Sequence, residues 1–283
     1  MSGYTNFAVV GAGTLGNYIV QQLLKDKAAG TVKEVVVLSR QGSKSTVQGD
    51  AKVIQVDYSN DESIKHALTG VDVAISTISG TAVDVQVKIA VAAKEAGVKL
   101  FVPSEFGGVT VEGQTEGRFG AKANIQSQLK ALGIPYAAFY TGLFADYIWS
   151  PFFDLDVTSG KVSVGGDGNK PITLTSRPDI ARYVSYILTH LPAEQLKNRA
   201  FTIAGDNKTF SEIFKAYDEK TGKKLEVTYL SLSELDAKIA ANPQNISFVL
   251  RKYWVTAAPF QGTDNHLYPD WNPSPAIDSL PVA

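Results

Sequence analysis

The sequence predicts an α/β fold, a doubly wound parallel sheet followed by a smaller α/β domain, from two observations. Short apolar runs alternate with segments of helical period through the first 145 residues. The runs are apolar throughout, as expected of parallel strands that helices cover on both faces. Right-handed crossovers then give the doubly wound order. With 283 residues, 44% of them apolar, the chain can bury a sizeable core.

Six strands are expected in this first part, at 7–10, 35–38, 53–56, 71–78, 100–102 and 136–140. After the first strand, Leu15, Ile19 and Leu23 recur every four residues and predict a helix with one apolar face. Further helices are predicted at 61–68, 83–96 and 121–132. Asn60 or Asp61 is the expected N-cap of the helix at 61–68, and a glycine directly follows each of the other two.

The pattern loosens after residue 145. A strand and turn are expected at 161–168, strands at 201–204 and 225–230, and helices at 178–191, 209–221 and 232–241. The tail from residue 258 is rich in Pro, Asn and Asp, which predicts an irregular course over the surface. We therefore expect one domain over 1–150 and a smaller one over 151–283, partly interleaved with the first.

Composition excludes several classes of function. The net charge of −1 gives no general attraction to nucleic acid or to an anionic membrane. Without cysteine, the chain has no disulfide and no thiolate, and its three distant histidines have no metal-ligand spacing. No metal site is predicted. The first residues lack a signal-peptide pattern, and no apolar run is long enough to span a bilayer, so the expected location is the cytoplasm.

A glycine-rich segment, G-A-G-T-L-G at 11–16, follows the first predicted strand and opens the first predicted helix. This is the context in which G-x-G-x-x-G binds a dinucleotide in a Rossmann domain. Gly11 allows the tight turn, Gly13 lets the backbone approach a pyrophosphate, and Gly16 allows close packing of helix on strand. We expect these glycines, with Thr14 and Leu15, to bind the cofactor. The alternative is a tight turn that binds nothing.

The end of the second strand distinguishes NAD from NADP. NAD proteins usually place an acid there for the ribose 2′-OH, but Glu34 lies at the opposite end of this strand. The strand ends instead in Ser39 and Arg40, and Lys44 follows. Arg40 can pair with a 2′-phosphate in a fork geometry, and Lys44 can add a point charge. The predicted cofactor is NADP(H), unless both cations are simply solvated at the surface.

Other strands end in polar residues that are candidates for the same site, because ligands of this fold lie outside the carboxyl ends of the strands. Asp57 ends the third strand, where it could accept the adenine amino group or cap a turn. Thr77, Ile78 and Ser79 end the fourth strand and should line the cofactor trough. Small polar residues are also common at strand ends for local reasons alone.

Two further motifs carry a family resemblance. P-S-E-F-G at 103–107 follows the fifth strand, and F-G-A-K ends at Lys122. Together with the glycine loop and Arg40, they resemble the isoflavone reductase-like and NmrA-like group of atypical short-chain dehydrogenases/reductases. Arg118 stands four residues before Lys122, so the Tyr-x-x-x-Lys signature of ordinary members is absent, as in the atypical group. The resemblance implies a Rossmann NADP domain, a smaller C-terminal domain and a substrate cleft between them.

The resemblance also implies roles for single residues. Lys122 matches the lysine that acts in proton transfer in enzymatic members, and it could reach the nicotinamide ribose. From spacing alone, Lys122 would be a surface lysine on an amphipathic helix. Pro103 and Ser104 are expected beside the cofactor, although Ser104 and Glu105 could equally cap the following turn.

The segment after the sixth strand is expected to pass the nicotinamide end of the cofactor. Gly142 and Phe144 are the candidates for cofactor contacts, and Phe144 and Tyr147 could be ring-stacking walls. The aromatic stretch continues to Phe153. Such a stretch is more often core than substrate pocket.

Two functions fit these motifs. The favoured one is an NADPH-dependent reductase of a small aromatic or conjugated substrate, like isoflavone reductase. The alternative is an NmrA-like redox-sensing regulator that binds NADP and a protein partner but catalyses nothing. Lys122 favours the enzyme. Asn124 and Gln126, where reductases often carry basic residues, favour the regulator.

Overall fold

A computed structural model describes residues 3–43, 47, 49–78, 85–115 and 117–281. The chain forms two compact units that interleave along the sequence, whereas the sequence suggests a boundary near residue 150. The first unit comprises Met1–Tyr140, Ile180–Phe201 and Leu267–Pro269, and the second comprises Thr141–Asp179, Thr202–His266 and Asp270–Ala283.

A parallel five-stranded sheet forms the centre of the first unit, in the order β3-β2-β1-β4-β5. Its strands are β1 (Asn6–Val10), β2 (Glu34–Arg40), β3 (Lys52–Val56), β4 (Val73–Ser76) and β5 (Leu100–Val102). A parallel bridge from Phe101 to Tyr136 adds β6 (Ala137–Tyr140) beside β5, and β10 (Arg199–Thr202) pairs with β6. β1, β4, β5 and β6 are almost wholly buried, which explains their continuous apolar runs.

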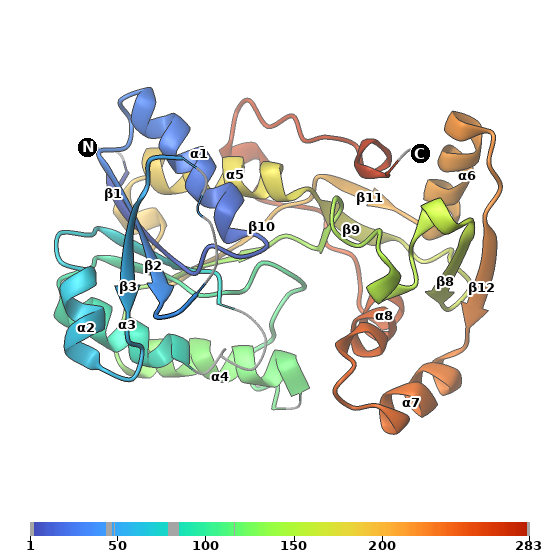
Figure 1. Ribbon diagram of the computed structural model, residues 1–283, viewed down its shortest axis with the longest axis horizontal. Coiled ribbons are helices and arrows are strands. Elements are labelled where there is room, and N and C mark those ends of the chain that lie inside the picture. Colours follow the sequence, from blue (N-terminus) through green and yellow to red (C-terminus); the bar gives the residue numbers. More distant parts are fainter. Residues whose placement is uncertain (1–2, 44–46, 48, 79–84, 116, 282–283) are drawn as a thin grey trace. The chain divides into compact units, whose positions relative to one another are not determined.

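Helices cover both faces of this sheet. They are α1 (Gly16–Ala28), α2 (Asp61–Ala67), α3 (Val85–Glu95), α4 (Gly117–Ala131) and α5 (Arg177–His190). Figure 1 shows α2, α3 and α4 on one side, and α1 and α5 on the other. On the first side, Ile64, Ile89 and Leu129 pack with sheet residues such as Val10 and Phe101. The doubly wound prediction is thereby confirmed.

Local sequence determines where two of these helices begin. Asn60 caps α2 by accepting hydrogen bonds from the backbone of Glu62 (3.0 Å) and Ser63 (3.3 Å), so Asn60 rather than Asp61 is the N-cap. Helix α4 begins at Gly117, four residues before the predicted start. Its first turn contains Gly120, whose added Cβ would lie 2.5 Å from the carbonyl oxygen of Thr115. This close approach excludes an apolar side chain at position 120. The helical period of apolar residues is therefore interrupted there, and it does not mark the start of α4.

The second unit is built from small sheets and three helices. β8 (Lys161–Gly165) pairs in parallel with β12 (Glu226–Leu230), and β9 (Ile172–Thr175) lies between β7 (Leu143–Phe144) and β11 (Asp206–Lys208). The helices are α6 (Phe210–Thr221), α7 (Leu232–Ala241) and α8 (Ile246–Thr256). Short 3-10 turns complete the described elements: Pro151–Phe153, Val157–Ser159, Ala193–Gln195, Asn265–Leu267 and Ala276–Ser279.

The core of the second unit corrects one expectation about the tail. Ala276 and Leu280 are buried in a cluster with Leu174, Phe210 and Trp254, so the tail does not run over the surface throughout. This packing could not be predicted, because isolated apolar residues between prolines show neither the helical nor the strand period. Among the described residues, no helix is both long and apolar enough to cross a membrane.

Candidate nucleotide and active site

The predicted cofactor residues of the first unit gather at one edge of the sheet. Because β1 to β5 are parallel, the residues that end them lie at the same edge. Gly11 follows β1, Arg40 ends β2, Asp57 follows β3, and Thr77 follows β4. Pro103 and Ser104 follow β5 in the same way, and Ile78 follows Thr77. Lys44 and Ser79 lie outside the described residues.

The glycine loop is a tight turn with one open face. Gly11 has φ +87°, a conformation that favours glycine. At Gly16 an added Cβ would lie 2.2 Å from the carbonyl oxygen of Gly11 and 2.6 Å from Thr77 Oγ1. At Gly13 an added Cβ would meet nothing within 4 Å, and Gly13 and Thr14 are exposed. Gly16 thus sets the closeness of helix to strand, and Gly13 presents bare backbone to solvent.

The start of α1 fits a phosphate group. Leu15 occupies the N-cap position and makes no side-chain capping hydrogen bond, and this described first turn holds no acidic residue. The first N–H groups of a helix have no intrahelical acceptor, and the helix dipole places partial positive charge there. The N–H groups of Asn17 and Tyr18 donate to the carbonyl oxygens of Gly13 (3.3 Å) and Leu15 (3.0 Å), and Leu15 has no side-chain acceptor to offer. An anion can bind at this positively polarised helix start. This observation fits the pyrophosphate of a dinucleotide.

The ends of β2 and β3 differ in how their polar residues are used. Arg40 is exposed, and it has no ion pair among the residues described, while its neighbour Ser39 is buried in the strand. Asp57 accepts hydrogen bonds from the backbone N–H (2.8 Å) and hydroxyl (2.6 Å) of Ser59. These hydrogen bonds from Ser59 lower the pKa of Asp57. Asp57 therefore caps a turn, while the Arg40 side chain is exposed to solvent.

The P-S-E-F-G segment forms a strained turn held from two sides. Phe106 has φ +28°, which is uncommon for a residue other than glycine, and its ring stacks on Phe139 at 6.2 Å. The N–H of Ser104 donates to Gln86 Oε1 at 2.7 Å, and Gln86 is buried on α3. Packing and hydrogen bonding together maintain the unusual backbone, as strained turns require.

Lys122 is a buried lysine rather than a surface one, with 8% of the residue exposed. Its ammonium donates a hydrogen bond to the backbone carbonyl oxygen of Glu105. It also lies 3.6 Å from Glu105 Oε2, and Glu105 is only 3% exposed. The turn after β5 and the first half of α4 are thus joined at one ammonium group.

A hydrogen-bond network surrounds the Glu105 carboxylate. Oε2 accepts from Thr110 Oγ1 at 2.8 Å, and Oε1 accepts from Gln126 Nε2 at 2.6 Å. Gln126 also donates to Tyr140 Oη at 3.0 Å, and Tyr140 donates to the carbonyl oxygen of Thr110 at 3.3 Å. Burial raises the pKa of Tyr140 to about 12, so this phenol remains a hydrogen-bond donor at neutral pH.

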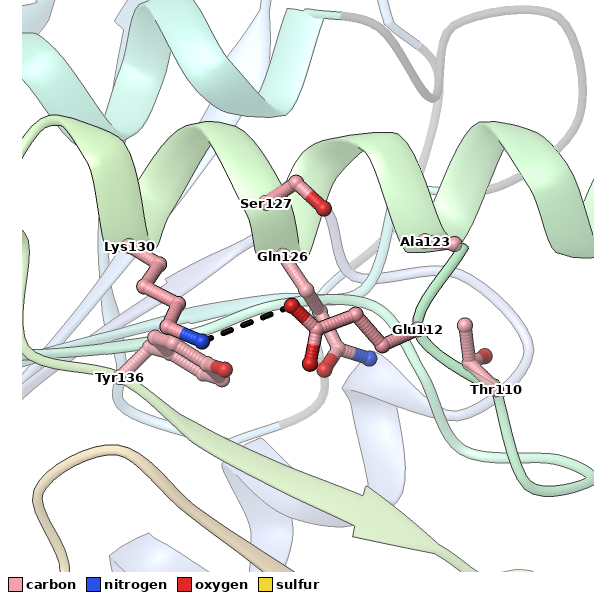
Figure 2. Close-up of a pocket in the computed structure, with 7 residues that line it drawn as sticks. All are labelled: Thr110, Glu112, Ala123, Gln126, Ser127, Lys130 and Tyr136. Atoms are coloured by element: carbon pink, nitrogen blue, oxygen red, sulfur yellow. Dashed lines mark hydrogen bonds and ion pairs between the residues drawn. The ribbon is translucent and has the colours of Figure 1, made fainter. Parts of the chain in front are cut away.

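A shallow pocket lies on the outer side of this network. Figure 2 shows its seven lining residues: Thr110, Glu112, Ala123, Gln126, Ser127, Lys130 and Tyr136. Lys130 and Glu112 form an ion pair across it at 3.5 Å, and both are well exposed to solvent. This pair contrasts with the buried Lys122 and Glu105 pair on the same helix and loop.

Comparison with known proteins identifies the family. The chain matches the NmrA-like family over residues 5–278. The protein belongs to the NmrA-like family. The resemblance predicted from the motifs is thereby confirmed.

Relatives of this NmrA-like chain include plant reductases. It is 33% identical over 259 residues to isoflavone reductase homolog P3 of Arabidopsis thaliana, covering 85% of this chain and 82% of that protein. It is 30% identical over 261 residues to phenylcoumaran benzylic ether reductase POP1 of Populus trichocarpa, covering 83% and 82%.

Two solved structures resemble this NmrA-like chain over nearly its full length. AtPrR2 with NADP⁺ and (+)-pinoresinol is 25% identical, with a TM-score of 0.80 and 99% of each chain covered. An isoflavone reductase is also 25% identical, with a TM-score of 0.78 and coverage of 98% and 99%. The predicted Rossmann fold is confirmed.

Candidate residues after the sixth strand belong to the second unit of the NmrA-like chain. Gly142 has φ +69°, and an added Cβ would lie 2.3 Å from the carbonyl oxygen of Thr173. Phe144 is half-buried in β7. Of the aromatic stretch that follows, Phe153 is buried in the core of the unit, whereas Tyr147 is exposed and has the Arg177 guanidinium 4.9 Å from its ring centre.

Sequence reasoning missed most of the network around Glu105 in this NmrA-like protein. No motif in the sequence indicates a role for Thr110 or Gln86. Gln126 stands out only because reductases often carry a basic residue at that position. These residues are 5 to 21 positions from their partners, so no local spacing connects them. The usable signal was Glu105 itself, an acid inside a specific motif directly after an apolar strand.

Proposed function

We propose that this NmrA-like chain is an NADPH-dependent reductase of a small aromatic or conjugated substrate. The observation that carries the proposal is the buried ammonium of Lys122, joined to the turn that follows β5 at the cofactor edge of the sheet. The relatives named isoflavone reductase homolog and phenylcoumaran benzylic ether reductase support the same reaction class.

NADP(H) is the proposed cofactor, as in the AtPrR2 structure solved with NADP⁺. The backbone from Gly11 to Gly16, with the first turn of α1, would hold the pyrophosphate. Arg40 would pair with the 2′-phosphate, assisted by Lys44. The remaining contacts proposed in the first unit lie at the same edge: Ser39, Asp57, Thr77, Ile78, Pro103 and Ser104. Ser79, outside the described residues, and Gly142 and Phe144 of the second unit stay predictions from the sequence. When bound, NADPH supplies a hydride.

Lys122 would act on the substrate rather than on the fold alone. A carbonyl, enone or quinone-methide acceptor gains negative charge as it is reduced, and an ammonium beside it stabilises that charge. The same ammonium can donate the proton that completes the reduction, so that one hydride and one proton are added in total. The phenol of Tyr140 and the amide of Gln126 are engaged in the network and would not react with the substrate.

A turnover assay and a comparison of two lysine variants test this proposal. The purified protein is mixed with NADPH and a panel of aromatic ketones, enones and phenylpropenyl esters, and loss of nicotinamide absorbance is followed. Lys122→Met should abolish turnover and leave NADPH affinity largely intact. Lys130→Met, an exposed lysine two turns along α4, is the matched control and should remain active.

The regulator is the alternative that this experiment separates. If no panel member is reduced and Lys122→Met changes nothing, the reductase proposal fails and an NADP-binding regulator with a protein partner takes its place. The cytoplasmic location expected from the sequence stays a prediction, which fractionation of source cells would test.

A further inference from the structure

The strongest unexplained feature of the first unit is the buried acid beside Lys122. Glu105 is 3% exposed, and a carboxylate in such a place is costly unless it is paired and hydrogen-bonded. A turn that needed only capping would place a neutral side chain there at lower cost. The burial of this acid therefore points to a role toward the group that it faces.

Among the described residues, the Glu105 side chain contacts Lys122 and two groups that fix its carboxylate. Oε2 faces the ammonium at 3.6 Å and accepts from Thr110 Oγ1, while Oε1 accepts from Gln126 Nε2. The backbone carbonyl oxygen of the same residue accepts a hydrogen bond from the ammonium. One residue thus contacts Lys122 twice, once through the main chain and once through a charge.

We propose that Glu105 is a positioning residue for Lys122, and that Thr110 and Gln126 fix the carboxylate in the orientation that this requires. Glu105 holds the Lys122 ammonium in one place, where it can face a substrate oxygen. Phe106, directly after Glu105, has φ +28°, which is uncommon for a residue other than glycine. This inference rests on the proposed function in one respect, namely that Lys122 acts on the substrate.

The first test changes the charge and keeps the shape. Glu105→Gln should lower kcat by about 10²-fold, the scale expected when a reacting group loses its position by about 1 Å. The KM of the substrate and the Kd of NADPH should remain unchanged, because a positioning role for Glu105 includes no contact with either. Glu112→Gln is the matched control, because it breaks the exposed ion pair with Lys130, which lies on α4 like Lys122. This variant should keep full activity.

A second pair of variants covers the case in which Glu105→Gln fails to fold. Thr110→Val removes the hydroxyl that holds Oε2 and keeps the side-chain volume, and it should lower kcat in the same direction by a smaller factor. Thr110→Ser keeps the hydroxyl and should restore kcat. A purely structural role of Thr110 would instead lower stability in both variants and leave kcat of the folded fraction unchanged.

A third readout needs neither cofactor nor turnover. In apo protein labelled with ¹³C-lysine, the two Hε protons of a held Lys122 should give separate signals, assigned by their loss in Lys122→Met. In Glu105→Gln these signals should merge as the side chain becomes mobile, and in Glu112→Gln they should stay separate. Separate signals that persist in Glu105→Gln would overturn the inference.

Comparison of the two single variants separates this inference from the function on which it rests. Where Lys122→Met is inactive and Glu105→Gln behaves like Glu112→Gln, the inference fails and the proposed function stands. Where Lys122→Met is fully active, both fail.

Discussion

The hydroxyl of Thr77 donates a hydrogen bond of 2.5 Å to the carbonyl oxygen of Gly11, and so links the end of β4 to the first residue of the glycine loop. Thr77→Val removes this bond and keeps the shape. A hydrogen bond contributes about 0.5–1.5 kcal/mol, so NADPH affinity should fall by about 3- to 10-fold if the bond preorganises the loop. Thr77→Ser should retain wild-type affinity in calorimetric titration. Equal affinities for all three proteins would remove the preorganising role.

Substitution of two glycines in the loop should affect different properties: stability at Gly16 and NADPH binding at Gly13. Gly16→Ala puts a Cβ 2.2 Å from the Gly11 carbonyl oxygen, so the backbone must shift, and overpacking of this kind costs about 1–3 kcal/mol of unfolding free energy. Gly13→Ala meets open space and should leave the apo protein's Tm unchanged, but its methyl group should obstruct the pyrophosphate and weaken NADPH binding. Thermal unfolding without ligand and titration with NADPH separate the two. A lower Tm for Gly13→Ala would contradict this reading.

Arg40 should determine the preference between the two nicotinamide cofactors. Charge-assisted hydrogen bonds are worth about 1.5–3 kcal/mol, so Arg40→Ala should weaken NADPH by about 10- to 100-fold or more and hardly affect NADH. Lys52, an exposed cation at the opposite end of the neighbouring strand, is the matched control, and Lys52→Ala should alter neither affinity. Equal losses of NADPH and NADH in Arg40→Ala would refute the 2′-phosphate role.

The buried carboxyl of Asp72 should make the stability of the protein depend on acid pH. Burial raises the pKa of Asp72, but hydrogen bonds from Lys99 (2.7 Å), Asn6 (2.9 Å) and Thr5 (3.1 Å) outweigh it and leave the pKa below its usual value. A carboxyl with a lowered folded-state pKa adds stability above its unfolded-state pKa, about 3.9, and loses it as the pH falls through the folded-state pKa.

Asp72→Asn should therefore unfold at lower denaturant concentration than wild type at pH 7. The gap between the two midpoints should narrow below about pH 4, as the wild-type carboxyl becomes protonated. Denaturant titrations at a series of pH values measure this gap. A gap that stays constant from pH 7 to pH 3 would mean that the charge of Asp72 is not what stabilises the fold.

The central strands of the first unit's sheet were predictable because they are buried on both faces. The expected run at 100–102 coincides with β5, and that at 7–10 differs from β1 by one residue. Burial on both faces leaves an uninterrupted apolar signal in each strand. The glycine loop was equally readable, since the tight turn at Gly11 and the close approach at Gly16 each demand glycine locally.

The second unit and the lysine network were less readable because non-local contacts create them. Helix α8 was not predicted, because its apolar, aromatic and basic residues form no distinct polar face in the sequence. In the structure Arg251 and Trp254 of this helix are buried. β9 was missed because its partners β7 and β11 lie about 30 residues away on either side. The contacts of Glu105 were likewise not predictable, because they form only where α4 places Lys122 and Gln126 beside it.

Calorimetric titration of the purified wild-type protein with NADPH and then with NADH tests the nucleotide site most directly. If the backbone after β1 binds the pyrophosphate and Arg40 selects the phosphorylated ribose, NADPH should bind one per chain and at least about tenfold more tightly than NADH. Absence of heat from NADPH at millimolar concentration, or equal affinity for the two nucleotides, would contradict it.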